Sequence, residues 1–210
     1  EHFPVASWLR VACSYVKRIS TGARWEDPAG DEVMLFLQEI KTRVHEADPV
    51  QGIWCVPRKE SGRIWCDASS IALGVVLEIE NSTVQDGAWL RKKNDFSHIN
   101  LAELEAVLKG LEMGIAWNLK RIEVMTDSVS VAGWLRAVLN DDYKVKVQGI
   151  AEILVKRRLA IIAEMVSEFS LEITVTWVRS EANKADILTR VNKISQFTSF
   201  TVKVQKHQKI

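Results

Sequence analysis

The stretch RIWCDASSIALGVVLEIENSTVQDGAWL, residues 63–90, sets the architecture of this chain. Apolar and β-branched residues dominate residues 63–67, 72–79 and 83–90, and short turns separate these three runs. Strands that follow one another at such short intervals are typical of an antiparallel meander. The sequence therefore predicts three consecutive antiparallel strands here.

The residues after this meander alternate between helical and strand patterns. Apolar residues recur at helical spacing from Leu101 to Ile115, which predicts a helix. Further strands are predicted at residues 121–126 and 171–178, and further helices at residues 128–139, 148–169 and 181–190. This order indicates an α/β fold in which helices flank one mixed sheet of five strands.

Two more helices are predicted before the meander, at residues 7–18 and 31–46. Neither can bury its apolar stripe alone, so we expect both to pack against another part of the protein. A proline and polar residues near residue 58 indicate a boundary. We therefore divide the chain into a helical connecting segment (1–58), an α/β domain (59–191) and a basic tail (192–210).

The composition excludes disordered and membrane-spanning proteins. Hydrophobic residues make up 47% of the chain and charged residues 26%, which is typical of a globular protein. No apolar run approaches the ~20 residues that cross a membrane, and the first residues lack a secretory pattern and a Met. Cys13, Cys55 and Cys66 are odd in number and lack zinc-ligand spacing. We expect a piece of a longer protein that is intracellular (cytoplasmic or nuclear), has no membrane partner and keeps its mostly buried thiols reduced.

Four acidic residues stand at informative places in this pattern. Asp67 ends the first strand of the meander, Glu103 lies on the following helix, Asp127 follows the next strand, and Asp186 lies in the last helix. Carboxylates are costly to bring together unless a cation lies between them, and a divalent metal ion is the usual one. The pattern therefore indicates metal-assisted chemistry on phosphate.

Glu103 and Glu105 compete for the helical position in this set. Glu105 shares its flank of the helix with Lys109, as a solvated face would. Glu103 shares its flank with small residues that include Gly110 and Gly114, so that flank can approach the rest of the protein. We therefore expect Glu103 to face inward.

Three of the four acids also have an ordinary explanation. Asp67 has the place of a turn former at a strand end, and Asp127 that of a helix N-cap. Asp186 has the spacing of a surface ion pair with Arg190. The order in which the four occur along strands and helices argues against chance placement.

Four short motifs carry a resemblance: WCDASS (65–70), AELEAV (102–107), MTDS (125–128) and NKADILTR (183–190). With them, the chain resembles the RNase H domain of retrotransposon and retroviral pol polyproteins, and in particular that of gypsy-like elements with long terminal repeats. The upstream residues are similar to the segment that joins reverse transcriptase to RNase H in such polyproteins.

The resemblance implies an RNase H-like fold and an endonuclease that hydrolyses the RNA strand of RNA:DNA hybrids. It implies two Mg²⁺ (or Mn²⁺) ions about 4 Å apart, with Asp67 bridging both, Glu103 and Asp127 holding one, and Asp186 holding the other. It also implies the reverse transcriptase part of the same polyprotein as a partner. Many RNases H carry a His in the loop before the last helix, whereas this loop reads WVRS (177–180).

A net charge of only +1 means that contacts with nucleic acid must come from a local basic patch. The candidates for these contacts are Arg91, Lys92, Lys93, Lys144, Lys146, Lys156, Arg157 and Arg158. For residues 156–158, a solvated helical face is the ordinary alternative. Two other functions stay open: a catalytically silent scaffold that binds hybrids, and a transposase- or integrase-type nuclease that uses an acid such as Glu181.

Overall fold

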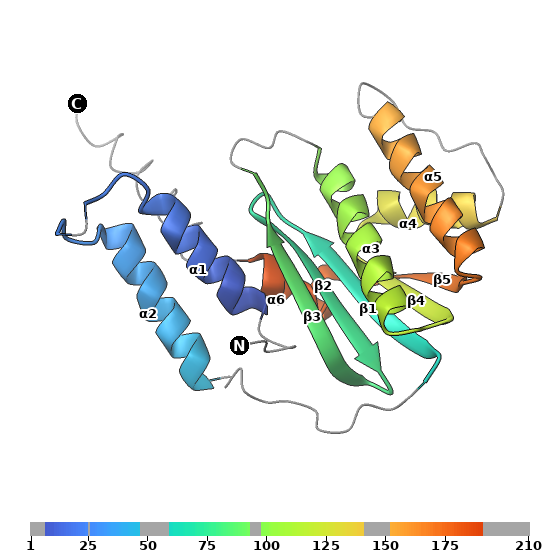
Figure 1. Ribbon diagram of the computed structural model, residues 1–210, viewed down its shortest axis with the longest axis horizontal. Helices are drawn as coiled ribbons and strands as arrows, with labels where there is room; N and C mark the ends of the chain where they lie inside the picture. Colours follow the sequence, from blue (N-terminus) through green and yellow to red (C-terminus); the bar gives the residue numbers. More distant parts are fainter. Residues whose placement is uncertain (1–6, 25, 47–58, 93–97, 141–151, 191–210) are drawn as a thin grey trace.

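The computed structural model describes residues 7–24, 26–46, 59–92, 98–140 and 152–190. Five strands form one mixed sheet in the order β3-β2-β1-β4-β5 (Figure 1). The strands are β1 (Ser61–Ala68), β2 (Ala72–Ile79), β3 (Ser82–Leu90), β4 (Arg121–Thr126) and β5 (Glu172–Trp177). The predicted fold class, a five-stranded mixed sheet flanked by helices, is confirmed.

The central strand β1 changes the direction of pairing within the sheet. It pairs antiparallel with β2, which pairs antiparallel with β3, and it pairs parallel with β4, which pairs parallel with β5. In the parallel ladder Cys66 lies opposite Thr126. Parallel strands end at the same edge of a sheet, so the residues that follow this pair, Asp67 and Asp127, meet at one edge.

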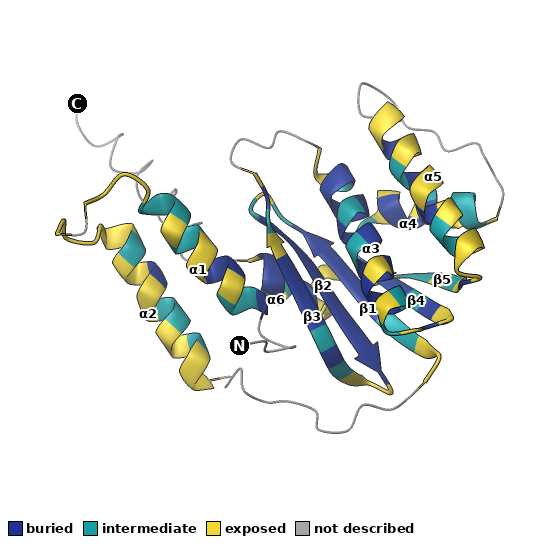
Figure 2. Ribbon diagram, in the orientation of Figure 1, coloured by how far each residue is buried: buried dark blue, intermediate teal, exposed yellow. Residues whose placement is uncertain are grey.

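Three helices pack on one face of the sheet: α3 (Ile99–Ala116), α4 (Val129–Leu139) and α5 (Glu152–Glu168). The largest buried core lies between them and β1, β2 and β4. Strand β2 is buried along its whole length, and β1 is buried from Ile64 to Ala68 (Figure 2). Helix α3 comes very close to the sheet, because a Cβ at Gly110 would lie 2.4 Å from the side chain of Ile64. The small residues on the Glu103 flank therefore permit this approach, as expected from the sequence.

A second core lies on the opposite face of the sheet. It joins helices α1 (Ser7–Ile19) and α2 (Asp31–Glu46), which we call the N-terminal hairpin, to the sheet and to the short helix α6 (Asp186–Thr189). Both helices of the hairpin were predicted from the sequence, as was their packing on another part of the protein. The division of the chain at residue 58 stays a prediction.

The last predicted helix, at residues 181–190, is not continuous. The structure has a 3₁₀ turn, η1 (Ser180–Ala182), and then the single turn of α6. Asn183 breaks the helix because its backbone is extended, with ψ at 108°. We call residues 180–190 the closing segment.

Other expectations concern the thiols and the membrane. Cys66 is a buried free thiol, but Cys13 is exposed, which corrects its predicted burial; Cys55 lies outside the described residues. Helix α1 leaves Cys13 at the surface because its apolar stripe runs through Val11 and Ala12. Among the described residues, no helix combines the length and the apolar character needed to span a bilayer.

Candidate metal centre

Three carboxylates from three different elements converge at the edge of the sheet. Asp67 comes from β1, Glu103 from the first turns of α3, and Asp127 from the residue after β4. One oxygen of each lies within 4.8 Å of the others. Ligands of one divalent cation lie 2.0–2.6 Å from it, and therefore at most about 4 to 5 Å from one another. The geometric requirement that follows from the sequence is met for these three residues.

Burial makes this carboxylate cluster electrostatically costly. Burial, and then the charges of Asp67 and Asp127, raise the pKa of Glu103 to about 9, although a backbone hydrogen bond from Ala68 opposes the shift. Burial also raises the pKa of Asp67 to about 6; the charges of Asp127 and Asp186 add to this shift, and a hydrogen bond from Thr189 opposes it. Each side chain thus holds its proton more tightly than it does in water, unless a cation compensates.

Glu103 also carries an oxygen without a partner. Its Oε2 atom is buried and accepts no hydrogen bond from any described residue. Buried polar atoms are normally satisfied, so such an atom calls for a ligand. Oxygen-only ligand sets suit Mg²⁺ and Mn²⁺, so the residues present fit a divalent metal ion.

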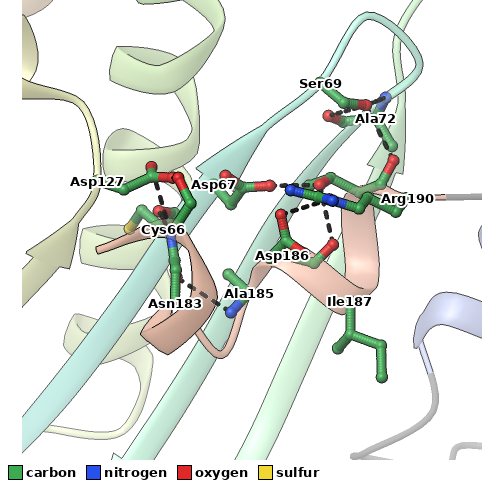
Figure 3. Close-up of polar contacts among 12 residues, drawn as sticks. Cys66, Asp67, Ser69, Ala72, Asp127, Asn183, Ala185, Asp186, Ile187 and Arg190 are labelled. Atoms are coloured by element: carbon green, nitrogen blue, oxygen red, sulfur yellow. Dashed lines mark hydrogen bonds and ion pairs between the residues drawn. The ribbon is translucent and has the colours of Figure 1, made fainter. Parts of the chain in front are cut away.

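The closing segment holds Asp127 in place. The Ser180 hydroxyl donates to Asp127 Oδ2, and Asn183 Nδ2 donates to Oδ1 at 3.4 Å and to the Cys66 carbonyl at 2.9 Å (Figure 3). Asp127 does not cap the following helix: the cap of α4 is Ser128, whose hydroxyl accepts from the Val131 N–H. The carboxylate of Asp127 is therefore directed to the cluster and not to the helix.

Asp186 lies outside the group of three. Its Oδ1 accepts from Arg190 Nε at 2.6 Å, the pair that the sequence spacing allowed (Figure 3). It still lies near the cluster, because its charge contributes to the raised pKa of Asp67. The residue of α6 that touches the cluster is Thr189, whose buried hydroxyl donates to Asp67 Oδ2. Sequence reasoning missed Thr189, although the motif of residues 183–190 contains it.

Glu105 faces away from the cluster, as predicted. It accepts from Arg158 Nε on α5 at 2.7 Å. Arg158 therefore has an internal partner, and Lys156 pairs with Glu152 at 2.6 Å.

Other basic candidates differ in exposure. Arg91 is buried and donates to the Ser69 carbonyl at 2.8 Å. Lys92 and Arg157 are exposed. The other three candidates lie outside the described residues: Lys93, Lys144 and Lys146.

Two known families match parts of this chain. Residues 61–190 match the reverse transcriptase-like family, and residues 1–46 match a family of domains of unknown function. No curated protein is similar enough in sequence to match.

Three of the solved structures that are similar to this chain differ in identity and coverage. The N-terminal RNase H domain of a Mycobacterium tuberculosis protein, solved as a fusion with maltose-binding protein, is 16% identical and has a TM-score of 0.51, over 68% of this chain and 99% of that one. RNase H1 of Halobacterium salinarum is 18% identical, with a TM-score of 0.47 over 60% and 90% of the two chains. The prototype foamy virus protease-reverse transcriptase is 11% identical, with a TM-score of 0.46 over 90% of this chain and 24% of that one.

The family match covers most of the chain, and the M. tuberculosis domain shares its sheet and helices. A more specific origin in gypsy-like elements stays a prediction. The α/β part of this protein has an RNase H-like fold, and the chain belongs to the reverse transcriptase-like family.

Proposed function

We propose that this protein is a metal-dependent endonuclease that hydrolyses the RNA strand of RNA:DNA hybrids within the polyprotein of a reverse-transcribing element. The observation that supports this most is the convergence of Asp67, Glu103 and Asp127, one of which, Glu103, has a buried oxygen without a hydrogen-bond partner among the described residues. The match of residues 61–190 to the reverse transcriptase-like family supports the retroelement setting. In that setting the reverse transcriptase part would be a partner, and the protein would be intracellular.

Each carboxylate has a defined task in this proposal. Asp67, Glu103 and Asp127 would hold Mg²⁺ or Mn²⁺, and Asp186 would join them after release from Arg190. Two bound ions would supply an activated water and stabilise the charge that develops at the scissile phosphate. Hydrogen bonds from the closing segment to Asp67 and Asp127 would orient these two carboxylates for metal binding.

Substrate contacts would come from basic residues around α5 and after β3. Lys92 and Arg157 are exposed and suit phosphate contacts, which position a nucleic acid without reading its sequence. We extend the same proposal to Lys93, Lys144, Lys146 and Lys156. We leave out Arg91 and Arg158, because both are at least partly buried and donate to groups within the protein. Lys156 stays in the proposal because it is exposed, although it pairs with Glu152.

The test is a cleavage assay with the purified chain. A hybrid with a labelled RNA strand is incubated with Mg²⁺ or Mn²⁺, in parallel with duplex RNA, duplex DNA and a sample containing a chelator. We expect internal cuts in the RNA strand of the hybrid only, and none with the chelator. Cleavage that persists in the chelator, or that is equal on duplex RNA, would contradict the proposal.

Two observations favour a second candidate function, binding of hybrids without cleavage. Arg190 pairs with Asp186, which keeps this carboxylate occupied. In the loop where many RNases H carry a His, this chain has Ser180, which donates to Asp127. Tight hybrid binding with no cleavage in either metal would support this alternative. For the transposase-type nuclease, Glu181 is exposed and lies outside the carboxylate cluster, so cleavage of duplex DNA is the result that would favour it.

A further inference from the structure

The N-terminal hairpin, which matches a family of unknown function, packs directly on the closing segment. Figure 1 shows α1 beside β3 and α6. Val11, Ala12 and Phe36 are almost fully buried and share one apolar core with Ala185 and Leu188. The hairpin therefore packs against α6 on the side away from the sheet.

The start of α1 is fixed to the sheet by a buried carboxylate. Asp86 on β3 accepts from the Ser7 N–H at 2.9 Å, and the Ser7 hydroxyl donates to the Asp86 carbonyl at 3.1 Å. Asp86 is 8% exposed. A buried carboxylate without donors is costly, so these hydrogen bonds favour the position of the start of α1 against β3.

Two arginines of the hairpin donate to backbone carbonyls of other elements. Arg43 on α2 donates to the Ile187 carbonyl of α6 at 3.3 Å. Arg18 on α1 donates to the Arg91 carbonyl at 2.7 Å. These bonds join the hairpin to α6 and to the residue that follows β3.

The contact of Arg18 continues inward through hydrogen bonds. Arg91 donates to the Ser69 carbonyl at 2.8 Å, and the Ser69 hydroxyl donates to the Thr189 carbonyl at 2.9 Å. The Thr189 hydroxyl in turn donates to Asp67. A series of hydrogen bonds therefore leads from α1 to the central carboxylate of the cluster.

We propose that the N-terminal hairpin positions the closing segment, and through it Asp67 and Asp127, for metal binding. Helix α6 has only four residues, and one helical turn has almost no stability of its own. Its position must come from packing, which the hairpin supplies on the side away from the sheet. The inference rests on the proposed function only in treating the carboxylates as a metal site.

Hydrogen exchange of the full chain tests this role. Val11 is 2% exposed in the interface, whereas Leu37 on the outer side of the hairpin is 44% exposed, so Val11→Glu and Leu37→Glu are matched variants. We expect Val11→Glu to speed the exchange of the Leu188 and Arg190 amides by at least about tenfold, because a buried charge detaches the hairpin. In Val11→Glu, the β1 and β4 amides should exchange as in the wild type, and the affinity for Mn²⁺ should fall. Leu37→Glu should change neither the amide exchange nor the Mn²⁺ affinity.

A milder pair of variants applies if Val11→Glu does not fold. Arg18→Gln removes the hydrogen bond to the Arg91 carbonyl, and Lys17→Gln removes an exposed charge from the same helix. Loss of one hydrogen bond predicts about two- to tenfold faster exchange at Leu188 in Arg18→Gln only. Unchanged exchange and Mn²⁺ affinity in Arg18→Gln would overturn the inference. Neither readout requires cleavage, so an inactive protein would refute the proposed function and leave this inference testable.

Discussion

In the absence of metal, the wild type should become less stable as the pH rises. The Glu103→Gln variant should lose less stability over the same pH range. Burial and two neighbouring carboxylates raise the pKa of Glu103 from 4.5 to about 9, so the folded protein binds this proton more tightly than the unfolded chain does. The free energy of unfolding therefore falls as the pH rises from 4.5 towards 9. Gln has nearly the same shape and no proton to lose.

The magnitude follows from the two pKa values. Each pH unit within this window costs about 1.4 kcal/mol, so the wild type should lose at most about 2.5 kcal/mol more than Glu103→Gln between pH 5 and pH 7. Asp67 titrates in the same range with a pKa of about 6, but it is present in both proteins, so the difference between them isolates Glu103. Its coupling to Glu103 reduces the difference below this upper value.

The assay is urea unfolding in a chelator at pH 5, 6 and 7. The matched control is Glu105→Gln, which changes the same helix but removes the partner of Arg158 instead of a member of the cluster. We expect the control to keep the pH dependence of the wild type. Adding Mn²⁺ should stabilise the wild type and the control but not Glu103→Gln, since binding to the folded state alone raises its stability. Equal pH dependence in the wild type and Glu103→Gln would show that Glu103 is not buried among charges.

Three further predictions have defined outcomes, and two of them include a control variant. Asp67→Asn should reduce hybrid cleavage to background and leave hybrid binding intact or stronger in a filter-binding assay, because one negative charge facing phosphate is lost; normal cleavage would falsify its role. Gly110→Ala should cost about 1 to 3 kcal/mol in urea unfolding, because the new Cβ would lie 2.4 Å from a buried isoleucine of β1. Gly133→Ala, whose Cβ meets nothing within 4 Å, should stabilise instead by about 0.5 to 1 kcal/mol. Arg157→Gln should lower the salt dependence of hybrid affinity by about one unit of slope, and Arg158→Gln should not, because Glu105 already pairs with it.

The elements that local patterns define could be predicted from the sequence. Residues 72–79 and 121–126 were predicted as strands with the bounds that β2 and β4 have, because turn residues mark their ends. The inward position of Glu103 followed from helical periodicity and from the glycines beside it, and the structure buries it. That Asp67 and Asp127 lie close together could be predicted only from the order of strands and helices along the chain, since the two residues are 60 positions apart.

Features that depend on tertiary partners could not be predicted. Arg158 had the sequence context of a phosphate contact, but Glu105, 53 residues away, pairs with it. The break of the last helix at Asn183 reflects bonds that this side chain makes to Cys66 on β1 and to Asp127, the residue after β4. The contact of Thr189 with Asp67 likewise joins residues 122 positions apart. No local pattern carries such information.

The late place of the closing segment in the chain affects the order of events during synthesis. A nascent chain that ends before residue 180 already carries Asp67, Glu103 and Asp127, but it has none of the donors that hold the first and last of them. Translation must pass Thr189 before every one of these donors is available. In a polypeptide still attached to the ribosome, Asp67 and Asp127 would therefore lack these hydrogen bonds until synthesis of this part is complete.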